Sequence, residues 1–290
     1  MSSRRLYRYI LYFCFLCCFV SSCINEDIEG CRHFALTVKA VGADGEDINI
    51  DSLHSLSVFM FKDNAYVGMV PSGSDGTYQL GYDKGVSLTF VAWANLNSDS
   101  LNVSRLSAGT KIEDALVQLK QDGGYDLSCS DLFYARKDFL ATRSSGAQED
   151  TATLVLKRTV SSLTITAKHL EQYFGQSPSY RYEVRGTKNT FNFLGELTGY
   201  DASYSPVSYF DSNRNFVTPV FHVFPSGDNE QVSVDIYRGD TRIFTANTDT
   251  HGVPLKAVVG KQVNILIDFS SASFTFKVSP WGVFEQNVEF

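Results

Sequence analysis

Cys23 is the residue whose neighbours predict a covalent modification. Three arginines stand within the first eight residues, an apolar run covers residues 9–20, and the small residues Ser21 and Ser22 directly precede the cysteine. This order is typical of a secretory signal that ends at a cleavage site, and the apolar run is too short for a membrane-spanning helix. We therefore expect residues 1–22 to be a signal peptide and Cys23 to become a lipidated amino terminus. An ordinary signal peptide that leaves a structural Cys23 is the alternative.

An acidic stretch, Ile-Asn-Glu-Asp-Ile-Glu, follows Cys23 at residues 24–29. Acyl chains contribute about 0.8 kcal/mol per buried methylene, so two or three of them hold a protein to a bilayer, whereas the acidic stretch cannot enter lipid. The stretch resembles the export signal of surface lipoproteins in the Bacteroidetes. We expect residues 23–33 to be a lipidated tether at the outer membrane, facing the cell exterior. A merely solvated linker explains the acidic residues equally well.

Two cysteines remain for a disulfide. Three of the six cysteines leave with the signal peptide and Cys23 is modified, so Cys31 and Cys129 are left to each other in an oxidising compartment. A bridge between them would close a loop of about 100 residues and contribute about 4 to 5 kcal/mol on the chain-entropy model. Two free buried thiols are the alternative.

No constellation of residues predicts an active site. The five histidines are scattered without the spacing of a zinc site, and the chain has no nucleophile elbow or phosphate-binding glycine loop. One carboxylate group could ligate calcium, but it lacks the glycine placement and terminal glutamate of an EF-hand loop. We prefer a solvated loop and expect no enzyme, no metal and no cofactor. The carboxylate group consists of Asp44, Glu46, Asp47 and Asp51 around Gly45 and Asn49.

The net charge and the positions of the tryptophans limit the classes of molecule that this protein is expected to bind. The 25 basic and 32 acidic side chains give a net charge of −7, and the loss of three arginines with the signal peptide takes it to −10. Nucleic acid is therefore not an expected partner. Trp93 and Trp281 lie in or beside expected strands, which favours core packing over a platform for stacking sugars.

Alternation of apolar and polar residues dominates the chain from residue 34 onward and predicts half-buried strands in antiparallel sandwiches. The clearest cases are 34–40, 86–92, 163–167, 180–184, 232–236 and 263–267. A helical set at Ile112, Ala115, Leu116 and Leu119 and a short turn within 168–174 predict connections. The polar stretch 143–150 interrupts the strands, so we expect an N-terminal β-sandwich at 34–150 and a C-terminal β-sandwich at 151–290.

Five segments occur in an order that matches one known family. They are Cys23–Cys31, Leu56–Phe61, Phe90–Asn95, Asp131–Tyr134 and Leu156–Val160. Together they resemble the FimB-like fimbrial anchor family of the Bacteroidales, lipoproteins at the base of fimbriae, over most of the chain after Cys23. The resemblance implies an all-β fold of two tandem Greek-key, transthyretin-like β-sandwich domains. From Trp281 to Phe290 the chain carries no motif of the family.

The resemblance also implies a function. We expect a lipid-anchored outer-membrane protein that tethers or nucleates a fimbria and joins fimbrial subunits by β-strand addition. The alternative is a surface lipoprotein that binds glycans or host molecules. An exposed edge strand would favour the first function, and a cluster of exposed aromatic side chains the second. The lineage further implies O-glycosylation in short Asp-Ser/Thr-apolar motifs, at Ser52, Ser100 and Thr151.

Residues 282–290 are the expected donor strand. Because the N-terminal strand leads to the lipid at Cys23, an anchor should keep that strand and offer a segment from its other end. In the segment, Phe284, Val288 and Phe290 fall on one face together with Gln286, and mostly polar residues fall on the other. A strand that closes the second sandwich of its own molecule has the same pattern and remains the alternative.

Overall fold

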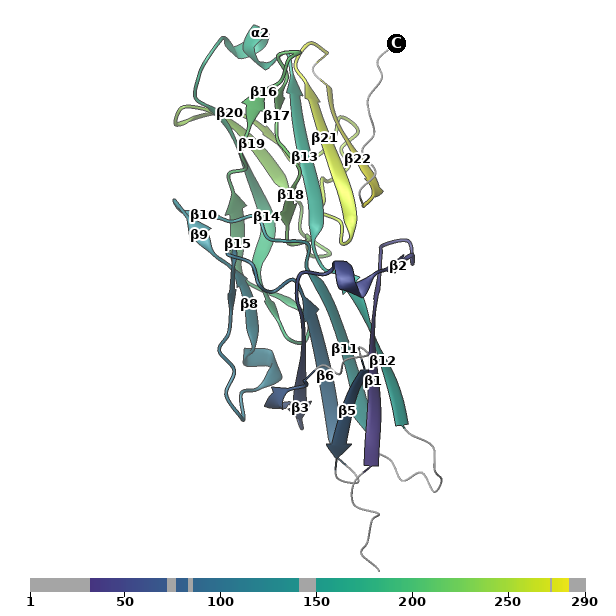
Figure 1. Cartoon of the computed structure of the whole chain (residues 1–290). Coiled ribbons are helices and arrows are strands. Elements are labelled where there is room, and N and C mark those ends of the chain that lie inside the picture. Colours follow the sequence, from purple (N-terminus) through teal and green to yellow (C-terminus); the bar gives the residue numbers. More distant parts are fainter. Residues whose placement is uncertain (1–31, 72–76, 83–85, 141–149, 272, 282–290) are drawn as a thin grey trace, which may run out of the picture.

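The structure is a computed structural model of the chain, and it describes residues 32–71, 77–82, 86–140, 150–271 and 273–281. Figure 1 shows an elongated molecule in which two β-rich halves lie end to end. The N-terminal strand β1 lies in one half, and the short helix α2 lies at the far end of the other half. Among the described residues, no helix is long and apolar enough to cross a membrane.

The N-terminal half contains one eight-stranded sheet, the N-terminal sheet. Its order is β2-β1-β12-β11-β6-β3-β4, and β5 pairs with β1 on the same edge as β2. Only β1 and β12 are parallel among these pairs. Apolar side chains that alternate along the strands, such as Leu36, Phe90 and Leu154, bury one face in a separate core. The strands are β1 Arg32–Val41, β2 Asp47–Ile48, β3 Leu56–Lys62, β4 Ala65–Met69, β5 Thr77–Tyr82, β6 Ser87–Ala94, β11 Phe133–Leu140 and β12 Asp150–Arg158.

Two six-stranded sheets form the C-terminal half. The β13 sheet has the order β16-β17-β13-β21-β22, with β18 also paired to β13, and the β14 sheet has the order β20-β19-β14-β8-β7, with β15 also paired to β14. Their inner faces share one core, which includes Ile165, Tyr182 and Ile265. The bounds are β7 Leu101–Val103, β8 Leu116–Leu119, β13 Ser161–Lys168, β14 Tyr180–Asn192, β15 Leu197–Tyr204, β16 Tyr209–Phe210, β17 Phe216–Val217, β18 Phe221–Val223, β19 Ser233–Arg238, β20 Thr241–Ala246, β21 Lys261–Asp268 and β22 Ser273–Pro280.

Short elements connect the sheets. They are the two-stranded ribbon of β9 Gln121–Asp122 and β10 Tyr125–Asp126, the 3-10 turns Ile50–Ser52 and Ile112–Asp114, and α2 Leu170–Phe174. The short turn expected within 168–174 is therefore confirmed. The helix expected at 112–119 is wrong, because the 3-10 turn ends at Asp114 and the chain continues as β8. Pairing with β14 imposes a two-residue period there and buries Val117 and Leu119.

The sheets do not divide at residue 150, where the sequence predicts a domain boundary. β12, at 150–158, lies beside β1 in the N-terminal sheet, whereas β7 and β8 lie in the β14 sheet. The polar stretch before residue 150 separates β11 and β12, which are antiparallel neighbours in one sheet. A polar stretch of this kind marks a connection between strands as well as it marks a linker between domains.

Aromatic side chains join the two halves into one core. The Phe59 and Trp93 rings, on the face of the N-terminal sheet opposite its separate core, lie 5.0 Å and 6.0 Å from the Phe193 ring of the C-terminal half. The Tyr134 hydroxyl donates to the carbonyl of Phe193 at 2.9 Å. Gly195 has a φ of 84°, and a Cβ there would meet the Tyr134 ring at 2.6 Å. Trp93 is fully buried, so the prediction that it packs in the core is confirmed.

Candidate functional site

The β13 sheet ends in an edge strand. β22 pairs with β21 along its whole length, from Ser273 opposite Asp268 to Pro280 opposite Lys261, and with no other strand in the described part of the chain. An edge strand offers backbone N–H and C=O groups to a further strand. An exposed edge strand is the feature expected of a protein that assembles fimbriae, rather than of a protein that binds glycans. The expected donor residues Phe284, Val288 and Phe290 lie outside the described residues.

Trp281, directly after β22, packs at the junction of the two halves. Its ring lies 4.7 Å from the guanidinium carbon of Arg158 at the end of β12, and 5.0 Å from the ring of His222 in β18. The same guanidinium carbon lies 5.0 Å from the centre of the Phe133 ring. Such cation–π contacts contribute about 0.5 to 2 kcal/mol, depending on how far they are desolvated. The end of β22 is thereby held against the N-terminal half.

An ion pair orients Arg158. Its Nε donates to both carboxylate oxygens of Asp131, at 2.9 Å and 3.1 Å. The Asn95 amide donates to the backbone carbonyl of Asp131 at 2.6 Å. Asn95, Asp131 and Arg158 each come from a different one of the segments on which the family resemblance depends, and the fold brings all three together. Trp281 and His222 belong to none of those segments, so sequence reasoning missed their part in this cluster.

Burial sets the protonation of the groups around Arg158. It raises the pKa of Asp131 above the ordinary value, while the charge and hydrogen bond of Arg158 act in the opposite direction. Burial also lowers the pKa of His222, and nearby Arg158 lowers it further, against the charge of Asp131 and a hydrogen bond to the Cys129 carbonyl, both of which raise it. The junction thus holds one ion pair beside a histidine that resists protonation.

Cys129 is buried, and it forms no disulfide within the described part of the chain. Burial raises the pKa of this thiol well above its ordinary value, so it is a poor nucleophile while the protein is folded. Its expected partner Cys31, like the expected lipidation site Cys23, lies outside the described residues. The disulfide between Cys31 and Cys129 and the lipidation of Cys23 therefore stay predictions.

The three expected glycosylation sites differ in exposure. Ser52, in a 3-10 turn, and Thr151, in β12, are exposed. Ser100 is less exposed than these two because it is half-buried, and its hydroxyl oxygen lies 2.6 Å from that of Ser98. Ser52 and Thr151 are therefore the more accessible acceptors, and modification of all three stays a prediction.

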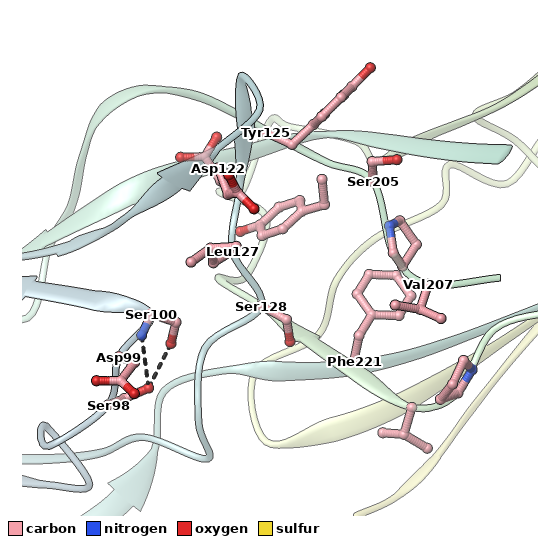
Figure 2. Close-up of a pocket in the computed structure, with 15 residues that line it drawn as sticks. Ser98, Asp99, Ser100, Asp122, Tyr125, Leu127, Ser128, Ser205, Val207 and Phe221 are labelled. Carbon is pink, nitrogen blue, oxygen red and sulfur yellow. Dashed lines mark hydrogen bonds between the residues drawn. The ribbon is translucent and has the colours of Figure 1, made fainter.

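A cleft of about 810 Å³ lies on one side of the C-terminal half (Figure 2). Its lining combines Asp99, Asp122 and Asp126 with hydroxyl groups and contains no lysine or arginine. Of the lining aromatic side chains, Tyr204 and Phe221 are buried and Tyr125 is half-buried. The lining thus offers one partly exposed aromatic ring and not the cluster of exposed aromatic side chains expected for glycan binding.

The acidic loop around Gly45 makes one contact within itself and one with the C-terminal half. The Asp44 carboxylate accepts from Lys261 Nζ at 2.6 Å, and Glu46 accepts from the backbone N–H of Asp44 at 3.1 Å. Within the described residues, no group of three or more histidine, cysteine or carboxylate side chains is placed to hold a metal ion. The ion pair between Asp44 and Lys261 thus links the loop after β1 to the start of β21, across the junction of the two halves.

Comparison with known proteins identifies the family. Residues 26–287 match the family model described as Mfa2, fimbrillin-A associated anchor proteins Mfa1 and Mfa2. The chain is 28% identical over 284 residues to the major fimbrium anchoring subunit FimB of Porphyromonas gingivalis strain W83, covering 92% of this chain and 93% of that protein. The fold is similar to that of the fimbrial anchor protein Mfa2 from P. gingivalis, with a TM-score of 0.64, 13% identity, and coverage of 87% of this chain and 98% of that one. The chain therefore belongs to the family of fimbrillin-A associated anchor proteins, whose role is structural and not enzymatic.

Proposed function

We propose that this protein is held in the outer membrane by lipid on Cys23, faces the cell exterior, and tethers or nucleates a fimbria by donating residues 282–290 as a β-strand to a fimbrial subunit. The observation that carries the proposal is that β22, which among the described residues pairs with β21 alone, is the edge strand from which residues 282–290 continue. The chain leaves this edge strand and enters a segment with an apolar face, in a family of fimbrial anchors. Strand addition joins sandwich subunits through backbone hydrogen bonds and through pockets for alternate side chains.

Deletion of residues 283–290 tests the donated strand. We expect a folded, lipidated protein that no longer holds a fimbria on the cell, because β22 keeps its pairing with β21 while the added strand is lost. Electron microscopy of cells and recovery of fimbriae from the culture medium measure retention, and circular dichroism measures folding. A truncated protein that unfolds, or that retains fimbriae normally, would exclude the donor strand.

Substitutions on the two faces of the segment are a sharper version of this test. Phe284→Asp with Val288→Asp places charge on the apolar face and should release fimbriae as the deletion does. The matched control, Glu285→Gln with Asn287→Asp, changes the polar face and should retain them. Equal retention by both variants would contradict insertion of the apolar face into a subunit.

The lipid anchor has its own test. Palmitate labelling should mark the wild type and not Cys23→Ala, which should leave the membrane fraction. Replacement of Glu26, Asp27 and Glu29 by their amides distinguishes the export signal from a solvated linker. An export signal predicts loss of surface accessibility to antibody with lipidation intact, and unchanged accessibility would show that the acidic stretch is only a linker.

A further inference from the structure

A second cleft, the waist groove, lies where the two halves meet. Its volume is about 770 Å³, and its lining comes from β11 and β12 on one side and from the β14–β15 turn, residues 225–228 and Val259 on the other. The lining includes Val155, Lys157, Leu194, Leu197, Asp228 and Val259. Residues of both halves line this groove, so it forms only when the two halves of the chain are folded together.

The floor of the waist groove is apolar and accessible. Val155 in β12 is 40% exposed and Val259 is 51% exposed, while Leu194 and Leu197 are half-buried. Side chains of neighbouring β12 residues on the opposite face, such as Leu154, are buried in the N-terminal core. Apolar side chains left open together in a groove favour the binding of an apolar segment.

The waist groove also carries an available positive charge. Lys157 is exposed and makes no ion pair with any described residue, whereas Arg136 pairs with Asp138 and Arg158 pairs with Asp131. Asp228 is the one carboxylate in the lining. An apolar segment with acidic residues therefore fits this groove better than a neutral or basic one.

Residues 282–290 have this chemistry and start close by. Phe284 and Val288 supply apolar side chains, and Glu285 and Glu289 supply negative charge. The segment follows Trp281, which packs on Arg158, and Arg158 lines the groove. Pro280 pairs with Lys261, two residues from the lining residue Val259. Nine extended residues span at most about 30 Å, so the segment can reach along the groove.

Charge distinguishes the waist groove from the larger cleft of the C-terminal half. That cleft carries Asp99, Asp122 and Asp126 and no basic residue in its lining, so it repels Glu285 and Glu289. We propose that residues 282–290 dock in the waist groove of their own molecule until a fimbrial subunit takes them as its added strand. This inference deepens the proposed function, and its test below needs no fimbria.

Photo-crosslinking in the full chain tests the docking. A benzoyl-phenylalanine in place of Phe284 leaves every described residue unchanged. In purified monomeric protein it should form adducts with waist-groove residues, above all Val155, Leu194, Leu197 and Val259, as located by peptide mass spectrometry. Adducts confined to other surfaces, or no adduct with the groove, would overturn the docking. Retention of fimbriae by the tail deletion would instead overturn strand donation, so the two failures are distinguishable.

Charge reversal is the second part of the experiment. Lys157→Glu should lower the yield of groove adducts about three- to tenfold, since an attractive exposed pair becomes a repulsive one. Lys62→Glu, at an exposed position in β3, the strand next to the edge strand β4, is the matched control and should keep the wild-type yield. Glu285→Lys with Glu289→Lys should restore the yield in the Lys157→Glu protein. Equal yields in all four proteins would overturn the electrostatic part and with it the assignment of this groove.

Discussion

The guanidinium group of Arg158 lies between the carboxylate of Asp131, at 2.9 Å, and the ring of Trp281, at 4.7 Å. Arg158, at the end of β12, thus contacts both Asp131 in its own half and Trp281, the residue directly before the proposed donor segment. When a fimbria pulls on a donated strand, the force is transmitted to Trp281 and β22, where the strand leaves the folded protein. There, the contacts of Trp281 with Arg158 and His222 supplement the pairing between β22 and β21.

Arg158→Ala should destabilise the protein by about 2 to 3 kcal/mol, because it leaves the mostly buried carboxylate of Asp131 without its partner and removes the contact with Trp281. Arg158→Lys should cost less, since it keeps the charge but loses the planar stacking. Urea unfolding followed by circular dichroism measures both. The control is Arg136→Ala, whose partner Asp138 is largely exposed, and its cost should stay below about 0.5 kcal/mol. Equal costs at the two positions would contradict a structural role for the junction pair.

The pH dependence of stability should depend on His222. Burial lowers its pKa in the folded protein below the ordinary 6.5, so the unfolded chain takes up this proton more readily. Stability should therefore fall as pH drops through 6.5 towards the folded-state pKa. In His222→Gln the loss of unfolding free energy between pH 7.5 and 5 should be smaller, and in the exposed control His54→Gln it should match the wild type. An unchanged loss in His222→Gln would refute the assignment.

Strand positions were predictable and strand partners were not. The alternation at 34–40, 163–167 and 263–267 corresponds to β1, β13 and β21, because a half-buried strand exposes every second residue. The parallel pairing of β1 with β12 joins segments more than 100 residues apart, and no local pattern encodes it. For the same reason the pattern at 112–119 predicts a helix where the structure has β8, since the partner strand β14 is distant in the chain.

The junction was predictable only in part. Asn95, Asp131 and Arg158 belong to segments that the family resemblance picks out, but their contact depends on how β6, β11 and β12 align. Trp281 gave only an expectation of core packing. It is half-buried, and it packs against the core as well as on Arg158. A single tryptophan beyond a strand does not reveal which distant cation it will meet.

Trp93→Ala should be among the most destabilising single substitutions, at about 3 to 5 kcal/mol. Trp93 is fully buried between the halves, 4.8 Å from the Tyr134 ring and 6.0 Å from Phe193, so its removal leaves a cavity that both halves line. Trp93→Phe should cost less because it keeps most of the volume. Val67→Ala, at an exposed position in β4, is the control and should change stability by less than about 0.5 kcal/mol. Chemical denaturation measures all three, and a cost for Trp93→Ala as small as the control would contradict a shared core.

The disulfide between Cys31 and Cys129 can be separated from simple burial of Cys129 by alkylation in two states. In the folded protein, burial and a raised pKa should protect Cys129 from iodoacetamide whether or not it is bridged. Denaturation without reductant removes this protection, so a bridged protein should still carry no label on either residue, as measured by peptide mass spectrometry. In Cys31→Ser the same treatment should label Cys129, which shows that the denatured thiol is reactive. Labelling of both cysteines in the denatured, unreduced wild type would refute the bridge and leave Cys129 as a buried thiol.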